Sequence, residues 1–524
     1  MGNNEHLPGM EIFFGDIHQE GIPFAGIKEK GERKNRKPRL KLINRNQLIL
    51  RSMDIDTLVG EDHDVRAIWE LIGRLDLSKY YKDIESVEGE SGRPAFDPQL
   101  LISIWIYSYS KGISSAREIS RLCNYDPAYQ WLTGMEEINY HTLSDFRVLY
   151  RDGLNGLFIE ILGVLSSEGL VTLERVMHDG TKVKANVSRD TFRREGRIRA
   201  HLEVAKEQVN LMEEMSEEEI TPRVARARER VVREKKELLE LALKELEKIR
   251  VIKGTKEEKE EVRVSITEPE SRHMKQSDGG YAPSYNVQIS TDAKEKIIVG
   301  VDVSQSGSDY EELVPAMEKV KENMGCEPSQ GVVDGGFISR ENILAMKEKE
   351  IDLIGPMDDR HSQSAGQMKR RGIDPAFHYE AFKYDKKSDT YICPADKILR
   401  YEGKESRKGK TNYKYRASAC ECQVCSLKQK CCPQNEKRGR GIVRGIDDPV
   451  VIAFKEKMKT EESKVIYKQR GAVAEFPNAW LKEKIGLRRF RLQGLIKAGI
   501  EALWACLTYN IKQWIRLCWR IQRA

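Results

Sequence analysis

The chain has 524 residues, too many for one compact core, so we expect two to four domains. Its 39% hydrophobic and 33% charged residues are typical of a soluble globular protein and argue against a membrane or disordered chain. The net charge of +6 is a small difference between 89 basic and 83 acidic residues, so it supports nucleic-acid binding only weakly.

The N-terminal 60 residues predict a basic arm. Residues 28–51 are strongly basic, poor in acids and contain one proline. Such a segment is suited to lie along a phosphate backbone or to form a solvated linker, and the sequence does not decide between the two. Residues 1–18 lack the apolar stretch of a secretory signal.

Residues 61–168 predict an all-helical domain. Short helices joined by tight turns, with arginines available, fit a DNA-binding unit of the helix-turn-helix kind, and a plain helical bundle is the alternative. We expect helices at Pro98–Ser110, at Ser115–Cys123 with a serine cap, around Asp126–Thr133 and at His141–Asp152.

A helical insertion is expected after the first strand. The apolar run Leu173–Met177 predicts a buried strand that ends just before Asp179. Residues 190–262 then consist mostly of Glu, Lys, Arg, Leu and Ala, with almost no aromatics. This composition predicts an antiparallel pair of long helices, the second of which begins at Pro222.

The pattern changes to alternating strands and helices from residue 285. The runs 285–291 and 296–303 alternate and are rich in β-branched residues, so they predict a hairpin. The final stretch, 490–524, predicts a long helix whose apolar face packs on the sheet. Between them we expect a helix at 309–325, a strand at 331–334, a helix at 339–350 and a strand at 351–355.

Two aspartates follow predicted strands. Asp179 and Asp334 come after apolar runs, and the C-terminal ends of strands meet at the edge where open α/β sheets place their sites. Each is followed by glycine, and Asp-Gly is also a common turn dipeptide. Together with Glu475 they would form a cluster of carboxylates, which repel one another unless a divalent cation joins them.

Four ordered blocks resemble those of the DDE transposases of bacterial insertion sequences. The resemblance extends over roughly 96–513, most of the chain. The blocks are DGTK at Asp179, the segment Ser271–Ser290, the Asp-Gly-Gly-aromatic pattern at Asp334–Phe337, and a Tyr-Arg-Glu-Lys signature at Tyr467, Arg470, Glu475 and Lys482.

The resemblance implies a fold. It predicts a ribonuclease H-like mixed sheet with helices over 169–514, interrupted by the helical hairpin at 190–262 and a Cys-rich insertion at 360–445. Residues 61–168 are similar to the all-α N-terminal domain of InsH-type transposases, which would recognise the terminal inverted repeats.

The resemblance also implies a reaction: cleavage of double-stranded DNA at element ends, followed by strand transfer into target DNA. Two Mg²⁺ or Mn²⁺ ions would stabilise the entering and leaving oxygens, with Asp179 bridging both, Asp334 holding one and Glu475 the other. The active form would be at least a dimer. The alternatives are a non-catalytic DNA-binding protein derived from a transposase and a metal-dependent nuclease that never joins strands.

Four further residues are candidates for DNA contact: Lys482, Arg470, Tyr467 and Lys182. Lys482 lies seven residues after Glu475, nearly two helical turns, so both can face one side. Arg470 departs from the family spacing, because four residues separate it from Glu475 instead of three. Five steps turn about 140° along an ideal helix, which takes Arg470 off the Glu475 face.

Six of the ten cysteines lie between residues 393 and 432. Cys422, Cys425 and Cys431 form a C-x2-C-x5-C pattern that suits one tetrahedral Zn²⁺. We choose Cys393 as the fourth ligand, and Cys420 and Cys432 are the alternatives. The alternative is a loop of free thiols that binds no metal. Basic residues flank this region, so a small zinc-containing module that contacts DNA is one interpretation.

The cysteine pattern does not resemble a disulfide framework, so we expect a reducing compartment, the bacterial cytoplasm, with the chain at the nucleoid. The longest apolar stretch, Gly494–Ile511, includes Lys497 and Glu501, so a membrane span is not expected.

Overall fold

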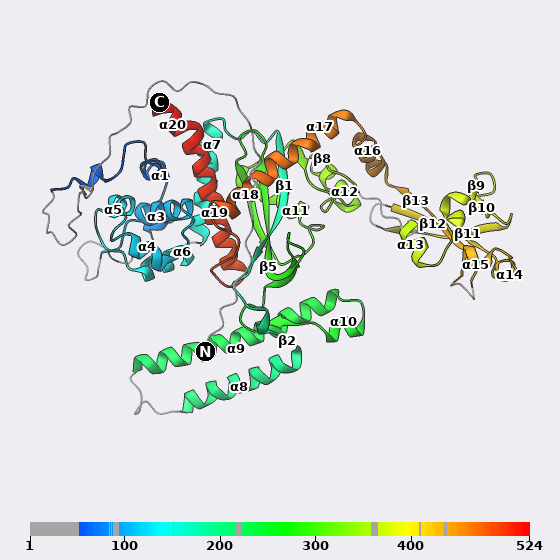
Figure 1. The fold of residues 1–524 in the computed structure, drawn as a ribbon, viewed down its shortest axis with the longest axis horizontal. Helices are drawn as coiled ribbons and strands as arrows, with labels where there is room; N and C mark the ends of the chain where they lie inside the picture. Colours follow the sequence, from blue (N-terminus) through cyan, green and yellow to red (C-terminus); the bar gives the residue numbers. More distant parts are fainter. Residues whose placement is uncertain are drawn as a thin grey trace, which may run out of the picture. The chain divides into compact units, whose positions relative to one another are not determined.

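The structure is a mixed α/β computed structural model (Figure 1). It describes residues 52–82, 84, 86, 94–149, 151–214, 222–357, 365–407, 410–433 and 438–523. The basic segment 28–51 lies outside these residues, so its prediction is not tested. A compact unit begins at Asp54 and extends to the end of the chain.

The N-terminal region is helical as predicted, and Ser115 caps its helix as predicted, whereas the cap at Asp97 is an additional finding. Asp97 accepts a hydrogen bond from the backbone N–H of Gln99 at 2.8 Å, and the Ser115 hydroxyl accepts one from Glu118. The helix expected at 141–152 is instead two, which end and begin close to residue 150. The helices are α1 (Asp64–Ile72), α2 (Ser78–Tyr81), α3 (Pro98–Ser110), α4 (Ala116–Leu122), α5 (Pro127–Thr133), α6 (Tyr140–Leu149) and α7 (Arg151–Ser167).

A six-stranded sheet positions two of the three predicted acids, Asp179 and Asp334. Its order is β4-β5-β1-β7-β8, and β6 also pairs with β5. The pairs β1–β7 and β7–β8 are parallel, whereas β5 runs antiparallel to β1, β4 and β6. The strands are β1 (Arg175–Lys184), β4 (Arg272–Lys275), β5 (Tyr281–Asp292), β6 (Ile298–Ser304), β7 (Gln330–Val332) and β8 (Asp352–Ile354).

The first strand is longer than predicted. We expected it to end before Asp179, but residues 176–184 all pair with β5, so β1 continues to Lys184. Asp179 therefore lies inside the strand, and Asp179–Gly180 is not a turn. Asp334 does occupy a turn, because its Oδ1 accepts the backbone N–H of Gly336 at 2.7 Å.

Helices cover both faces of this sheet. α11 (Leu313–Met324) and α12 (Arg340–Glu348) alternate with the last strands as predicted. The predicted C-terminal helix is divided into α19 (Leu495–Trp514), a π-helical turn and α20 (Arg520–Arg523). α19 packs on β6, where the Asn510 amide bonds both the N–H and the C=O of Ile298 at 2.9 and 2.8 Å.

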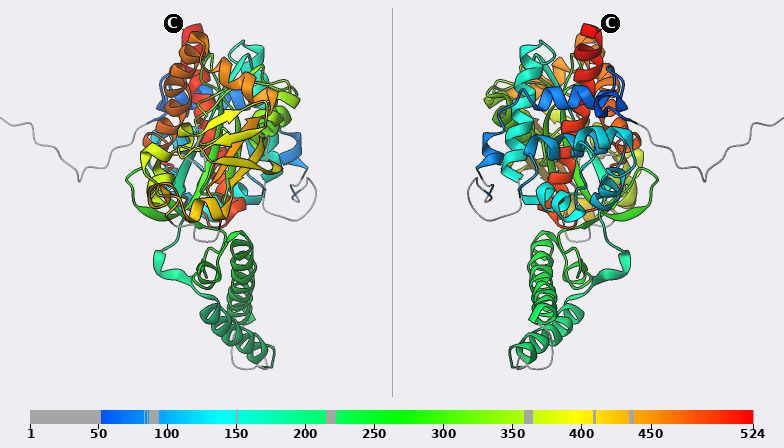
Figure 2. Two further views of the ribbon diagram at one scale, coloured as in Figure 1. Left: turned by 90° about the vertical axis from the view of Figure 1, so that its right-hand side faces the viewer. Right: turned by 90° about the vertical axis from the view of Figure 1, so that its left-hand side faces the viewer.

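The predicted helical pair forms an insertion between β1 and β5. α8 (Glu195–Glu214) and α9 (Pro222–Ile252) run side by side (Figure 1), and Figure 2 shows the same green helices turned by 90°. Pro222 begins the second helix as predicted. They are followed by α10 (Lys256–Glu260). The insertion has its own apolar core, which includes Ile198, Leu239 and Leu246. The short antiparallel pair β2 (Phe192–Arg193) and β3 (Val264–Ser265) closes its base.

The Cys-rich insertion contains a five-stranded antiparallel sheet in the order β13-β12-β11-β10-β9. None of the ten cysteines forms a disulfide. In the described part of the chain, no helix is both long and apolar enough to cross a membrane. The elements here are α13 (Ala365–Arg370), β9 (Lys383–Asp385), β10 (Thr390–Ile392), β11 (Ile398–Arg407), β12 (Lys410–Ala417), α14 (Ala419–Gln423), α15 (Lys428–Cys431) and β13 (Gly441–Asp447).

Three helices follow the Cys-rich insertion and return the chain to the main sheet: α16 (Pro449–Lys457), α17 (Glu461–Arg470) and α18 (Phe476–Glu483). A π-helical turn, Gly471–Glu475, joins the last two. Ile466, Val473 and Ala474 of this segment form one apolar cluster with Met177 of β1 and Val332 of β7. The segment therefore packs across the parallel strands β1 and β7.

Candidate active site

Strand register brings the two aspartates together. Met177 of β1 is opposite Val332 of β7, and Asp179 and Asp334 each lie two residues further along the chain. Side chains two residues apart on a strand share a face, so Asp179 points to the same side as Met177. That is the side on which the helical segment with Glu475 packs.

Arg470 joins the three candidate acids. One of its guanidinium nitrogens donates to Oδ1 of Asp179 at 2.9 Å and lies 3.7 Å from Oδ2 of Asp334. Another lies 3.9 Å from Oε1 of Glu475. The Arg470 and Asp179 side chains are only 12% and 17% exposed, whereas Asp334 and Glu475 are 40% and 65% exposed. Three carboxylates thus surround one largely buried cation.

The expectation that Arg470 turns away from Glu475 is wrong, and the π-helical turn is the reason. A π-helix bonds residue i to residue i+5, so residues five apart come onto one face. The additional residue between Arg470 and Glu475 is absorbed by the turn Gly471–Glu475. Pro477, which lacks an N–H, is the second residue of α18, just after this turn, and cannot donate to a regular helical ladder there.

Asp179 has a second partner that the sequence interpretation missed. The Asn478 amide donates to Oδ2 of Asp179 at 3.0 Å, so both carboxylate oxygens accept hydrogen bonds. Burial raises the pKa of Asp179, and the nearby Arg470 charge opposes this shift. Asn478 lies three residues after Glu475, about one helical turn, and this spacing was the available signal.

A polar network lies on the other face of β1. His178 is buried and bonds to Ser290 and Gln288, and burial lowers its pKa to about 4, so it is neutral. Asp309 accepts at Oδ1 from Gln288 at 3.1 Å and from Lys182 at 3.0 Å. A Cβ on Gly180 would lie 2.7 Å from that same oxygen, so only glycine fits here. The network anchors the strand beneath Asp179.

The predicted DNA contacts lie in three different environments. Lys182 is paired with Asp309 and is 17% exposed. Tyr467 is partly buried and packs on the apolar cluster under α17. Lys482 is partly buried, and burial lowers its pKa while the nearby Asp179 charge acts in the opposite direction. Of the predicted contacts, Lys482 and Arg470 are the two beside the acids.

The acids suit a divalent cation, although no cluster of three ligating side chains is formed among the described residues. The guanidinium of Arg470 occupies the position between the carboxylates where a positive charge is needed. Asp334 and Glu475 are exposed enough to turn toward a smaller ion. Carboxylate oxygens are the ligands that Mg²⁺ and Mn²⁺ prefer.

The four predicted zinc ligands line one small cavity of about 30 Å³, together with Cys432. The backbone N–H groups of Ala395 and Lys397 donate to Sγ of Cys393, and that of Arg440 donates to Sγ of Cys422. Such bonds stabilise thiolates. Burial raises the pKa of the Cys431 thiol to about 12, so it is protonated unless a cation is close.

Two stretches of the chain match protein-family models. Residues 392–515 match "Transposase DDE domain", and residues 53–149 match "Transposase domain (DUF772)". The first match includes Arg470 and Glu475, and the second covers the N-terminal helices α1–α6. Asp179 and Asp334 lie outside both. No curated protein matches the chain.

Proposed function

We propose that this chain, whose two matches confirm the resemblance to a DDE transposase of an insertion element, cuts DNA at element ends and joins them to target DNA. The observation that carries the proposal is the meeting of Asp179, Asp334 and Glu475 around one cation. These acids come from positions nearly 300 residues apart in the chain, as the resemblance requires.

The six-stranded sheet supports a ribonuclease H-like frame for this site. Its central strand β1 has an antiparallel hairpin on one side and the parallel strands β7 and β8 on the other. Helices follow the hairpin and β7 in the order expected for that fold. The first acid lies within the central strand and the second follows its parallel neighbour.

The chain's own residues would divide the work as follows. Asp179, fixed by Asn478 on a paired strand, would be the shared metal ligand, and Asp334 and Glu475 would complete the set. When bound, Mg²⁺ or Mn²⁺ supplies charge stabilisation and lowers the pKa of the attacking hydroxyl or water. Arg470, released from the carboxylates, and Lys482 would hold the phosphates that flank the cut.

The test is cleavage of a labelled duplex that carries the DNA flanking the reading frame. Asp179→Asn, Asp334→Asn and Glu475→Gln should each abolish Mg²⁺- or Mn²⁺-dependent cutting and leave DNA binding intact. Asp302→Asn, an exposed acid on β6, is the control and should cut normally. Retained cutting in any of the three variants refutes the assignment.

The products separate the competing functions. Joined products identify a transposase, and nicks without joined products identify a nuclease. DNA binding by the wild type without either product identifies a non-catalytic DNA-binding protein. The three acids around one cation favour the first two over the third.

The remaining parts have proposed roles as well. The helices α1–α7 would recognise terminal inverted repeats, and the chain would act at the nucleoid in the cytoplasm as a dimer or larger assembly.

The thiols of Cys393, Cys422, Cys425 and Cys431 would hold one structural Zn²⁺, because they line a single cavity. Metal analysis tests this: Cys422→Ser with Cys425→Ser should remove bound zinc, whereas the exposed Cys326→Ser should retain it.

A further inference from the structure

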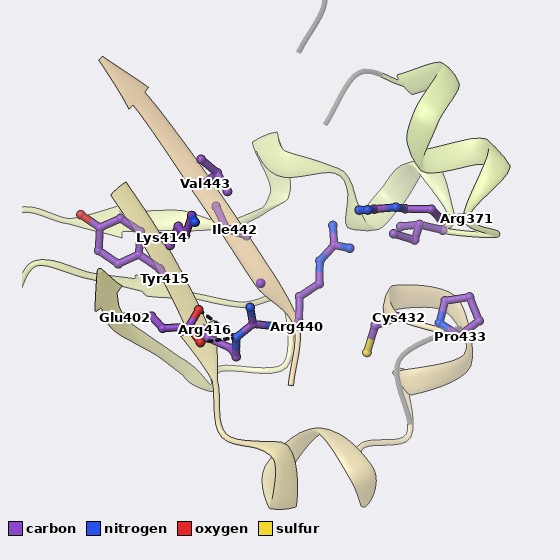
Figure 3. Close-up of a pocket in the computed structure, with 12 residues that line it drawn as sticks. Arg371, Glu402, Lys414, Tyr415, Arg416, Cys432, Pro433, Arg440, Ile442 and Val443 are labelled. Atoms are coloured by element: carbon purple, nitrogen blue, oxygen red, sulfur yellow. Dashed lines mark hydrogen bonds and ion pairs between the residues drawn. The ribbon is translucent and has the colours of Figure 1, made fainter. Parts of the chain in front are cut away.

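A basic cavity lies on the five-stranded sheet of the Cys-rich insertion. Its volume is about 510 Å³, and its charged lining consists of Arg371, Lys414, Arg416, Arg440 and Glu402 (Figure 3). Four cations and one carboxylate give this lining a net charge of +3. None of the three candidate catalytic acids lines it.

Two of the cations already have acidic partners. Nε of Arg416 donates to both carboxylate oxygens of Glu402 at 2.9 Å, and Nζ of Lys414 donates to Glu405 at 2.8 Å. Both acids are partly solvent-exposed, with 43% of the Glu402 and 55% of the Glu405 side chain accessible. Exposed ion pairs are worth at most about 1 kcal/mol, so a stronger anion exchanges with them easily.

The other two cations are without a carboxylate among the described residues. Arg440 is 6% exposed; it donates to the backbone carbonyl of Phe377 at 3.2 Å, and its Nε has no hydrogen-bond partner. Arg371 is exposed and extends toward the same space as Arg440 (Figure 3). Like charges gathered in one cavity favour a polyanion.

The strand geometry suits a phosphate backbone. Lys414 and Arg416 are two residues apart on β12, so they lie on one face about 7 Å apart. One DNA strand carries a charge about every 3.4 Å along its axis, so this pair extends over about two phosphates. The wall of the cavity continues with Gly441, whose missing side chain leaves room for the Arg416 guanidinium.

We propose that this basic cavity binds the phosphate backbone of DNA, as a second DNA contact outside the three-acid site. The inference rests on the proposed function in taking DNA as the partner, but it concerns binding and no chemical step. Contacts to phosphates carry no base information, so the cavity would hold flanking or target DNA of any sequence.

The test uses the full chain, a short DNA duplex of arbitrary sequence and the double variant Arg371→Gln, Lys414→Gln. We expect the Kd of the variant to rise about 10-fold at moderate salt, and the slope of log Kd against log salt to fall by about 2, because each lost phosphate contact removes about 0.9. Lys387→Gln, an exposed lysine between β9 and β10, is the control and should leave both quantities unchanged.

A charge-restoring variant, a thermal melt and a competition with inorganic phosphate complete the test. Arg371→Lys with Lys414→Arg should restore the slope, and a thermal melt verifies that the Gln variant is folded. An unchanged slope in the folded Gln variant overturns the proposal. Inorganic phosphate that binds the wild type and is not displaced by the duplex also overturns it, because the cavity would then be a small-anion site.

The proposed function fails independently of this inference. Asp179→Asn should bind the duplex with the wild-type slope and cut nothing. If Asp179→Asn cuts DNA and the slope of log Kd against log salt decreases in the Gln variant, the catalytic assignment is wrong and the proposal for the basic cavity is supported. If Asp179→Asn is inactive and the Gln variant binds DNA with the wild-type Kd and salt dependence, only the proposal for the basic cavity is wrong.

Discussion

Arg470 does at the residue scale what a metal ion would do in the same place. Three carboxylates within 4 Å of one guanidinium would repel one another strongly without it, because the Asp179 side chain is only 17% exposed. The arginine therefore keeps the acids together when no cation is bound. Any divalent cation that enters must share or displace it.

Replacing Arg470 tests this role. Arg470→Gln should lower the free energy of unfolding of the metal-free protein by about 3 kcal/mol, because a largely buried carboxylate loses its cation. Mn²⁺ should restore more stability to the variant than to the wild type, because the metal then has no competitor. Urea denaturation with EDTA and with Mn²⁺ measures both effects.

The matched control is Lys464→Gln, which removes an exposed ion pair with Glu461 on the same helix and should cost less than about 1 kcal/mol. Equal stability of wild type and Arg470→Gln in EDTA would contradict the proposed role of the arginine.

The sequence predicts the acids better than their surroundings. Asp179, Asp334 and Glu475 belong to motifs with local signatures, and the structure brings them together. Asn478 and the Asp309 network were not foreseen, because a polar side chain shows no sign in the sequence of which strand it will face. The predicted direction of the Arg470 side chain is wrong, because the prediction assumes an ideal α-helix where the structure has the π-helical turn Gly471–Glu475.

The π-helical turn is the decisive feature at the element scale. A π-helical turn is equivalent to an α-helix with one additional residue. The turn absorbs this residue, so α17 and α18 face the same directions as they would in a continuous α-helix that lacked it. Deleting the exposed Ala472 should convert the turn to α-helix and leave Arg470 and Glu475 on one face. We expect the deletion variant to fold and to bind Mn²⁺ with an affinity within about threefold of the wild type, about 0.6 kcal/mol.

The opposite change is the control. Inserting one alanine after Ala472 should rotate α18 by about 100° relative to α17 and take Glu475 and Asn478 away from Asp179. Mn²⁺ titration should then detect a loss of binding. Loss of binding in the deletion variant as well would show that the π-turn itself, not the phase of the helices, is required.

Asp447, at the end of β13, connects two elements to the Cys-rich insertion. Nε of Arg340 in α12 donates to it at 2.7 Å, and Lys455 in α16 donates to its other oxygen. Burial raises the pKa of Asp447, but these two hydrogen bonds outweigh it and hold the pKa at about 2, below the ordinary 3.8. A lowered pKa means that folding favours the charged form.

Asp447→Asn should therefore lower the free energy of unfolding at pH 7 by about 2 kcal/mol, close to the value of the pKa shift. The difference from the wild type should persist down to about pH 4 and shrink as the pH falls toward 2. Urea denaturation from pH 7 to pH 3 measures it. Glu456→Gln, an exposed acid on α16, should show no such dependence, and a constant difference down to pH 3 would contradict the assignment.

The sequence predicts the ends of helices and strands correctly where residues next to those ends determine them. The serine cap at Ser115 and the proline at 222 mark helix starts as predicted, because each acts on its own backbone. β1 was predicted too short because its second half is stabilised by pairing with β5, more than 90 residues away in the chain. The only local feature of the sequence that indicates such pairing is the alternation of polar and apolar residues.

At the scale of the whole molecule, the described residues contain more than one apolar core. The helical pair α8–α9 has a core that shares no residue with the main core, and its principal polar link to the sheet is Glu245 with Arg272. The composition of residues 190–262 predicts the helical pair but not its separate core, which appears only in the structure. At its base, the strand pair β2–β3, the ring contact of Phe192 with His273 and the hydrogen bond from Gln305 to Glu245 add further links.

Excising the helical pair tests that independence. Arg193 is directly opposite Val264, so replacing residues 194–263 with Asn-Gly makes a two-residue hairpin turn of the kind that fits twisted strands. Arg272 then becomes exposed to water, so no unpaired charge stays buried. We expect one cooperative thermal transition within about 4 °C of the wild type and unchanged Mn²⁺ binding at the three acids. Aggregation, or a second transition absent from the wild type, would show that the helical pair stabilises the sheet that holds the site.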